Sequence, residues 1–203
     1  MSLDSDIIAS DLEVFGAERR RSARTLTVLR VVRVVAGHER GLARLVNISD
    51  HGLRIATRLD LLLGDEIAVD LSEHCSLTGR VVWRTPEHCA IRFLVPVDCV
   101  ALLRRLVEDR AAEGRMALGL VFDKSILARS ELGLQTVRLR HISPRAARIA
   151  HDGRLRPDML VKLTIAPSLE CHGVIRTSHD GMAEVELLRP LSPDQLGSVR
   201  ALS

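Results

Sequence analysis

Two polar clusters, about two dozen residues apart, hold the side chains of this chain best suited to binding a charged ligand. One is an arginine run from Arg19 to Arg24, and the other is the segment Asn-Ile-Ser-Asp-His-Gly from Asn47 to Gly52. Arginine presents a planar fork of donors that fits phosphate oxygens and guanine edges, and its guanidinium can stack on a purine. The amide of Asn47 can accept from a base N–H, and the hydroxyl of Ser49 can bond a phosphate or a base edge. Gly52 permits a positive φ or a close backbone approach.

The order and spacing of these clusters carry more weight than either cluster alone. At this arginine content, Arg-x-x-x-Arg, as in Arg20 and Arg24, is expected by chance roughly three or four times. An Asn-x-Ser-x-x-Gly segment could be an ordinary turn between two strands. A β-branched run from Thr25 to Val35 separates the two clusters. A strand there would let the arginines embrace a ligand from one side while the turn forms the other wall.

This arrangement resembles the two signatures of the PilZ family, Arg-x-x-x-Arg and Asp/Asn-x-Ser-x-x-Gly. The similarity covers about Glu18 to Phe93, with one departure at Cys89-Ala90, where a glycine is usual before the final Ile-x-Phe. It implies a six-stranded barrel with a C-terminal helix that binds the bacterial second messenger cyclic di-GMP. An arginine at position 19 is compatible in that family with two intercalated ligand molecules per site. The ligand-binding residues implied by the motif match are Arg20, Arg24, Asn47, Ser49, Gly52 and Arg19.

The hydrophobic pattern predicts short strands without βαβ alternation, which favours a small antiparallel barrel. The strands are expected at residues 25–35, 42–48, 53–57, 66–71, 76–84 and 89–94. Trp83, in an apolar strand run, is expected in the core. Asp98 is expected to cap a helix to about Ala112, with Val100, Leu103 and Val107 on one face. A short amphipathic helix is expected at residues 5–16.

The second half of the chain repeats the first in three blocks, at offsets of 94, 93 and 92 residues. The predicted fold class is therefore mainly β, with two small six-stranded antiparallel barrels and short flanking and linking helices. The expected domains are a helical segment at 1–17, a PilZ domain with its C-terminal helix at 18–113, and a degenerate PilZ-like barrel at 114–203. The second copy keeps Ser143 but has His141 and Ala146 at the other motif positions. It is expected to fold without binding the ligand, and could pack against the first barrel, a partner, or a second copy as a homodimer.

Composition narrows the classes of function and location. The chain has 203 residues, 46% hydrophobic and 2% aromatic, with a net charge of +3. Few aromatic platforms and a modest net charge disfavour nucleic acid as a partner. Only two of the 29 basic residues are lysines, an arginine excess that a GC-biased genome would also produce. Four cysteines without C-x-x-C spacing indicate neither a disulfide framework nor a metal site. With no apolar leader core and no membrane-spanning run, we expect a cytoplasmic protein.

The leading interpretation is a bacterial signalling receptor or adaptor that changes conformation on binding cyclic di-GMP and controls an unknown downstream protein. The alternative is a structural or assembly module whose site is vestigial. No nucleophile elbow, P-loop, paired-histidine motif or carboxylate dyad suggests an enzyme, and no cofactor beyond the ligand is expected.

Overall fold

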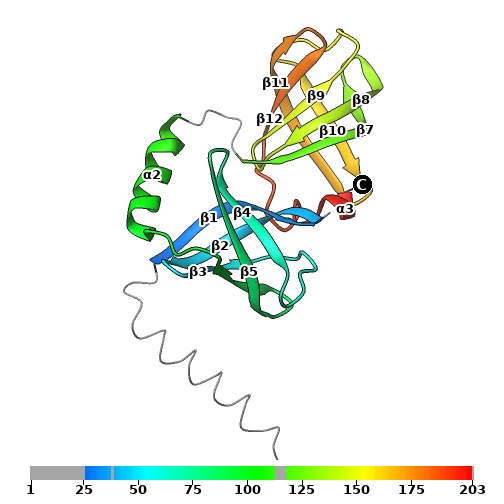
Figure 1. The fold of residues 1–203 in the computed structure, drawn as a ribbon. Coiled ribbons are helices and arrows are strands. Elements are labelled where there is room, and N and C mark those ends of the chain that lie inside the picture. The colour runs from blue at the N-terminus through cyan, green and yellow to red at the C-terminus, as the bar shows by residue number, and fades with distance from the viewer. Residues whose placement is uncertain (1–25, 38, 113–117, 203) are drawn as a thin grey trace, which may run out of the picture.

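The computed structural model describes residues 26–37, 39–112 and 118–202. The arginine run and the helix expected at 5–16 therefore lie outside the described residues. The described chain forms two closed antiparallel barrels of six strands each, one after the other in sequence (Figure 1). The predicted fold class is confirmed.

The strands of the first barrel follow the predicted ones closely. They pair in the order β1-β2-β3-β6-β5-β4, and β4 closes the barrel against β1. The largest difference is at the start of the second strand, which begins at Glu39 instead of the predicted Leu42. The strands are β1 (Leu26–Ala36), β2 (Glu39–Ser49), β3 (Gly52–Ala56), β4 (Glu66–Ser72), β5 (Cys75–Arg84) and β6 (His88–Phe93).

The second barrel has the same strand order, at a uniform offset of 94 residues. Gly79 pairs with Phe93 in the first barrel, and Gly173 pairs with Leu187 in the second. The predicted offsets of 93 and 92 for the later blocks were wrong. A slip of two residues preserves the inward–outward alternation of a strand, so the pattern alone did not exclude it. The strands are β7 (Leu120–Ser130), β8 (Gly133–Ile142), β9 (Ala146–Ala150), β10 (Leu160–Ala166), β11 (Leu169–His179) and β12 (Met182–Leu187).

A helix, α2 (Cys99–Ala112), packs beside the first barrel, and its expected cap is confirmed. The backbone N–H of Ala101 donates to Oδ1 of Asp98 at 2.9 Å. Val100 and Val107, on the face named from the sequence, are 45% and 72% exposed, while Leu106 is buried. The helix carries enough aliphatic residues for two stripes, so spacing did not decide between them. No helix among the described residues is long and apolar enough to cross a membrane.

The two barrels meet where the β1–β2 hairpin contacts the C-terminal segment, which ends in α3 (Val199–Leu202) (Figure 1). The backbone N–H of Leu42 donates to the carbonyl of Leu196 at 2.9 Å. The Leu42 side chain, 1% exposed, belongs to the core cluster of the second barrel. Arg33 adds a bond of 3.0 Å from Nη1 to the carbonyl of Gly119. The first barrel thus contributes a core residue to the second.

A candidate ligand-binding face on the first barrel

Four side chains on four strands form a row across the outside of the first barrel. Asn47 on β2 lies opposite Arg54 on β3, which lies opposite Ala90 on β6, which lies opposite Trp83 on β5. Asn47, Arg54 and Ala90 are half-buried, and Trp83 is exposed. We call Asn47, Arg54, Ala90 and Trp83 the outer row.

Two β-bulges turn members of the outer row toward solvent. The β2–β3 register shifts between Leu45 and Asn47, and the β5–β6 register shifts between Val81 and Trp83. Leu45 and Val81 point into the core, so regular alternation would have placed the residues two positions later inside as well. An extra residue in each bulge reverses the phase. The prediction that Trp83 lies in the core was therefore wrong: its side chain is 43% exposed.

The Asn47–Gly52 turn stands at one end of this row and has a fixed geometry. Oγ of Ser49 donates to the carbonyl of Gly52 at 3.1 Å. Asp50 ties the turn to the start of α2, because its Oδ1 accepts from the N–H of Cys99 at 3.1 Å. Gly52 does not have a positive φ, but a Cβ there would overlap the carbonyl of Ile91. Close backbone approach is therefore the reason for this glycine.

Arg54 lies above the indole of Trp83, with its Cζ 5.6 Å from the ring centroid, a cation–π geometry. The side chain of Ala90 between them is a single methyl group, which leaves room for this contact. Nε of Arg54 is buried and has no hydrogen-bond partner in the part of the chain that the structure describes. A buried donor without an acceptor is costly, so this nitrogen is a favourable place for a ligand acceptor.

The neighbouring positions on this face combine small side chains with further arginines. Arg92 lies opposite Gly52, two register pairs from the outer row, and Arg44 lies opposite Ala56. Both arginines are exposed at the surface. Small and cationic residues therefore lie side by side on this face, a combination that suits an anionic ligand.

The structure brings together three of the six predicted ligand residues: Asn47, Ser49 and Gly52. The other three, Arg19, Arg20 and Arg24, lie outside the described residues. Arg24 precedes Leu26 by only two residues, and Leu26 pairs with Ile48, inside the predicted motif. In sequence, the arginine run therefore ends two residues before a strand that pairs with this motif.

Sequence reasoning missed Arg54 and misplaced Trp83. Arg54 could have been found, because alternation from the buried neighbours Leu53 and Ile55 points it outward beside Gly52. The position of Trp83 depends on a bulge, which has no clear pattern in the sequence.

Two of the four cysteines lack the features of a reactive thiol. Cys89 and Cys171 are buried, and burial raises the pKa of both thiols to about 11. Such thiols stay protonated at neutral pH and are poor metal ligands. Among the described residues, no group of three or more His, Cys, Asp or Glu side chains could hold a metal ion.

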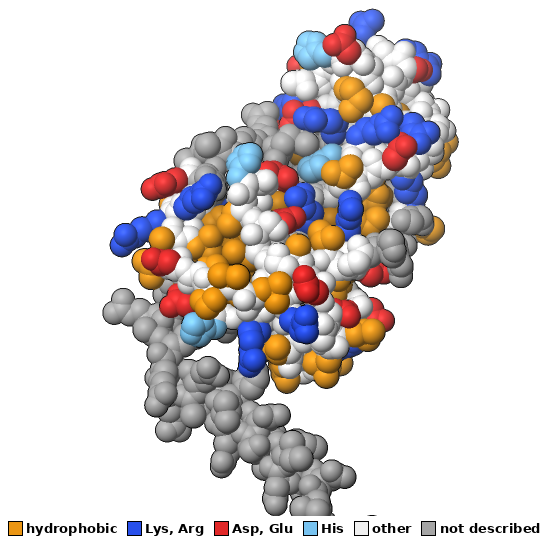
Figure 2. Space-filling view, in the orientation of Figure 1, with side chains coloured by type: hydrophobic (Ala, Val, Ile, Leu, Met, Phe, Trp, Pro, Cys, Tyr) orange, Lys and Arg blue, Asp and Glu red, His pale blue; other side chains and the backbone are white. Residues whose placement is uncertain are grey.

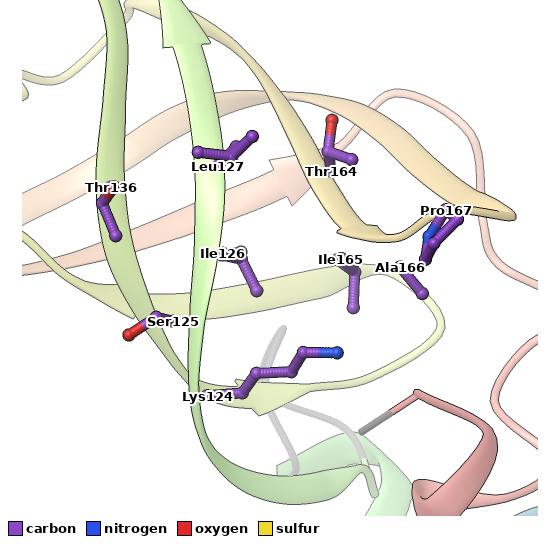
Figure 3. A pocket seen from close by; sticks show the side chains of 9 residues that line it. All are labelled: Lys124, Ser125, Ile126, Leu127, Thr136, Thr164, Ile165, Ala166 and Pro167. Carbon is purple, nitrogen blue, oxygen red and sulfur yellow. The ribbon is translucent and has the colours of Figure 1, made fainter.

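A shallow hollow of about 400 Å³ lies on the second barrel, between β7, β8 and β10 (Figure 3). Leu127, Thr136 and Thr164 line it, with Lys124 at one side. Lys124 donates through Nζ to the carbonyl of Leu202. No arginine lines this hollow, so it lacks the donor set of the face on the first barrel.

The first barrel is thus a small β-barrel domain whose candidate site is an open face beside a turn. Residues 18–109 match the family model described as PilZ domain, and this part of the chain belongs to that family. The resemblance identified from the motifs is confirmed over these residues.

Searches for similar proteins add weak likenesses over most of the chain. The PlzA protein of Borreliella burgdorferi, in complex with c-di-GMP, has a TM-score of 0.39 and 12% identity, covering 93% of this chain and 97% of that one. The Bacillus subtilis inhibitor of motility MotI/DgrA has a TM-score of 0.32 and 13% identity, covering 87% and 94%. The MrkH–c-di-GMP complex of K. pneumonia has a TM-score of 0.30 and 12% identity, covering 86% and 83%. No curated protein matches the chain.

Proposed function

We propose that this protein is a receptor for cyclic di-GMP that binds the ligand on the outer face of the first barrel. The carrying observation is the position of the Asn47–Gly52 turn. This turn lies within a PilZ domain and beside Leu26, the first residue of β1. Leu26 follows Arg24 by two residues in the sequence. This position supports a site that the two halves of the motif would share.

Each predicted residue has a distinct role in this proposal. Arg20 and Arg24 donate paired hydrogen bonds to the phosphates and guanine edges of the ligand. Asn47 accepts from a guanine N–H. The lone pairs of Ser49 accept from a ligand N–H while its hydroxyl donates to the carbonyl of Gly52. The missing Cβ of Gly52 allows the close approach of the Ile91 carbonyl. Arg19 stacks between two intercalated ligand molecules.

Ligand binding orders the arginine run against the barrel, and this change is the signal that a partner protein reads. The arginine run is covalently continuous with β1, whose hairpin contacts the second barrel. On the face drawn in Figure 2, basic and acidic side chains alternate over both barrels. This mixture favours a small ligand over a nucleic-acid strand, which would need a continuous basic stripe.

Calorimetry with cyclic di-GMP, GTP and a short oligonucleotide tests the proposal. We expect micromolar or tighter binding of cyclic di-GMP alone. Arg20→Ala or Arg24→Ala should weaken it at least tenfold, because each charge-assisted bond contributes roughly 1.5–3 kcal/mol. Arg21→Ala is the matched control, within the same run but outside the Arg-x-x-x-Arg pair. Absence of cyclic di-GMP binding to the unmodified protein would favour the structural module with a vestigial site.

The number of ligands at the endpoint tests the role of Arg19. Two molecules of cyclic di-GMP per chain are expected for the unmodified protein, and one for Arg19→Ala. An endpoint of one ligand per chain in both proteins would remove Arg19 from the site.

A further inference from the structure

The helix α2 has two apolar stripes, one of which packs on the first barrel. Cys99 and Leu106 belong to the core of that barrel, and Leu102 packs against it. Val100 and Val107, seven residues apart, share another face of the helix and are exposed. Exposed valines repeated along one helix face form a surface that a further apolar segment can cover.

A basic side chain lies within this exposed stripe. Arg104 follows Val100 by four residues and precedes Val107 by three, so it shares their face, and it is exposed. Arg105 is exposed too, but each helical residue turns about 100° from the last, which directs it away from the stripe. An occupant of this face should therefore be apolar along its centre and acidic beside Arg104.

The segment 5–16, outside the described residues, has this composition. Its sequence predicts an amphipathic helix with Ile8, Leu12 and Phe15 on one face. Asp11 lies three residues after Ile8 and four before Phe15, so a helix would place its carboxylate beside that face. The segment contains three acidic residues and no lysine or arginine. It is thus complementary to the exposed face of α2 in both hydrophobicity and charge.

The described chain begins close to α2. Leu26, the first residue of β1, pairs with a residue two positions before Asp50. Oδ1 of Asp50 accepts from the backbone N–H of Cys99, at the start of the helix. Further along β1, Nη1 of Arg30 donates to the carbonyl of Leu106 at 3.2 Å. Figure 1 accordingly shows the start of β1 beside the first turn of α2.

The intervening chain is long enough for the segment to reach the helix. Residues 17–25 join the segment to β1 and would span up to about 30 Å when extended. The helix α2 has 14 residues and is therefore about 21 Å long. Every part of the exposed stripe lies within reach of residues 5–16.

We propose that residues 5–16 of this chain dock as an amphipathic helix on the face of α2 formed by Val100, Arg104 and Val107. The apolar side of the segment covers both valines, and the carboxylate of Asp11 pairs with the guanidinium of Arg104. Docking anchors the arginine run at one end, and β1 anchors it at the other. The run then forms a loop held beside the motif turn, which reduces the conformational freedom that a ligand must restrict.

Amide hydrogen exchange of the full chain without ligand tests this docking. The amides of residues 5–16 should exchange about tenfold more slowly in the unmodified protein than in Val100→Ser/Val107→Ser. Serine and valine have similar helix propensities, so α2 itself should persist in the variant. Strand amides that exchange alike in both proteins exclude loss of folding as the cause. Equal exchange of residues 5–16 in the two proteins would overturn the proposal.

Charge reversal tests which side of α2 the segment contacts. Arg104→Glu should speed the exchange of residues 5–16 about twofold to fivefold, as expected for an exposed ion pair. Arg105→Glu is the matched control, with the same charge change on the other side of the helix, and should leave this exchange unchanged. Combining Arg104→Glu with Asp11→Arg should restore slow exchange. Equal effects of the two single reversals would contradict the assigned face.

Dilution distinguishes this segment from the same segment of a second copy. Docking within one chain predicts exchange rates that do not depend on protein concentration. Rates that rise on dilution would assign the face to a second copy and overturn docking within the chain. These measurements use no cyclic di-GMP, so they can fail while the proposed function stands. A chain that docks residues 5–16 but binds no cyclic di-GMP would refute the proposed function alone.

Discussion

The two barrels share a backbone but differ in what their outer faces carry. Their β-bulges fall at equivalent places: the shift between Leu45 and Asn47 recurs between Leu139 and His141, and the shift between Val81 and Trp83 recurs between Ile175 and Thr177. A bulge is fixed by hydrogen bonding and by the core, so it persists when the outward side chain changes. The shared bulges therefore point the same positions outward in both barrels, and the side chain at each position determines what that surface can bind.

The serine of the motif shows which features belong to the fold. Oγ of Ser143 donates to the carbonyl of Ala146 at 3.2 Å, as Oγ of Ser49 donates to Gly52 at 3.1 Å. Ser143 is completely buried, whereas Ser49 is half-buried. Because a serine closes this turn in both barrels, its primary role is structural. The candidate site is distinguished by what differs around it, namely Asn47 and Gly52.

In the second barrel, the position equivalent to Asn47 lies at the junction between the barrels. His141, 94 residues later, packs so closely on Gly119 that a Cβ there would overlap its ring. Gly119 in turn accepts from Arg33 of the first barrel. Burial lowers the pKa of His141, while the charge of Glu73 from the first barrel raises it. The equivalent of the candidate ligand face is thus partly covered by the first barrel.

At the surface that joins the barrels, the first barrel is the one that is covered and the second is the one that is open. The first barrel uses Val31, Arg33 and Leu42 there, and the second barrel has Ser125, Leu127 and Thr136 at the equivalent positions. Those three residues line the open hollow of Figure 3. The face around Asn47 is therefore open in the first barrel, and its equivalent in the second barrel is partly covered. The face around Leu127 is open in the second barrel, and its equivalent in the first barrel forms the junction.

The largest expected effect concerns the ligand and would test the division of roles directly. The double variant Arg20→Ala/Arg24→Ala should lose about 3–6 kcal/mol of binding free energy, the sum of two charge-assisted contributions. Calorimetry should then show no residual binding of cyclic di-GMP to the full chain. Residual saturable binding of normal affinity would show that the second barrel has a site of its own.

The next effect tests the junction. Leu42→Ala should lower the free energy of unfolding by about 2–5 kcal/mol, because it empties a fully buried position in the core of the other barrel. The matched control is Thr136→Ala, at the equivalent exposed position, with an expected change within about 0.5 kcal/mol. Urea unfolding measures both. Equal changes in the two variants would contradict the difference between the surfaces.

Much of the fold could be predicted from the sequence, and the misses have physical causes. Alternation over β-branched runs located the strands, since the signal is repeated along each one. The phase of the strand at Trp83 was wrong, because a bulge depends on pairing with a distant strand. The offset of the repeat was wrong by up to two residues, because a two-residue slip leaves the pattern intact.

The candidate site was predicted where its residues are local in sequence. Ser49 and Gly52 lie within one turn, so their contact follows from spacing alone. The association of Arg54 with Trp83 requires three strands in register, which no local pattern contains. A homodimer through the second barrel stays a prediction.

A smaller effect is expected from the glycine of the turn. Gly52→Ala should cost about 1–3 kcal/mol of unfolding free energy, because its Cβ would overlap the carbonyl of Ile91 and force the strands apart. The reverse change, Ala146→Gly, should cost only about 0.5–1 kcal/mol through chain entropy. Thermal or urea unfolding compares them. A neutral Gly52→Ala would show that the first barrel accommodates a Cβ at this point, as the second barrel does at Ala146.

The smallest effect is a pH dependence that arises at His141. Burial keeps the folded-state pKa of this histidine below its ordinary value, so the unfolded chain binds the proton more readily. Its contribution to stability is therefore complete above the ordinary histidine pKa and is lost as the pH falls below it toward the folded value. His151 is shifted in the same direction by burial, so His141→Asn should flatten the slope of unfolding free energy between pH 7.5 and about 5 without abolishing it. This substitution also places in the second barrel the residue type that the first barrel has at Asn47. His151→Asn is the control that should leave the His141 part of the slope in place, and an unchanged slope in His141→Asn would mean that the junction does not keep this histidine neutral.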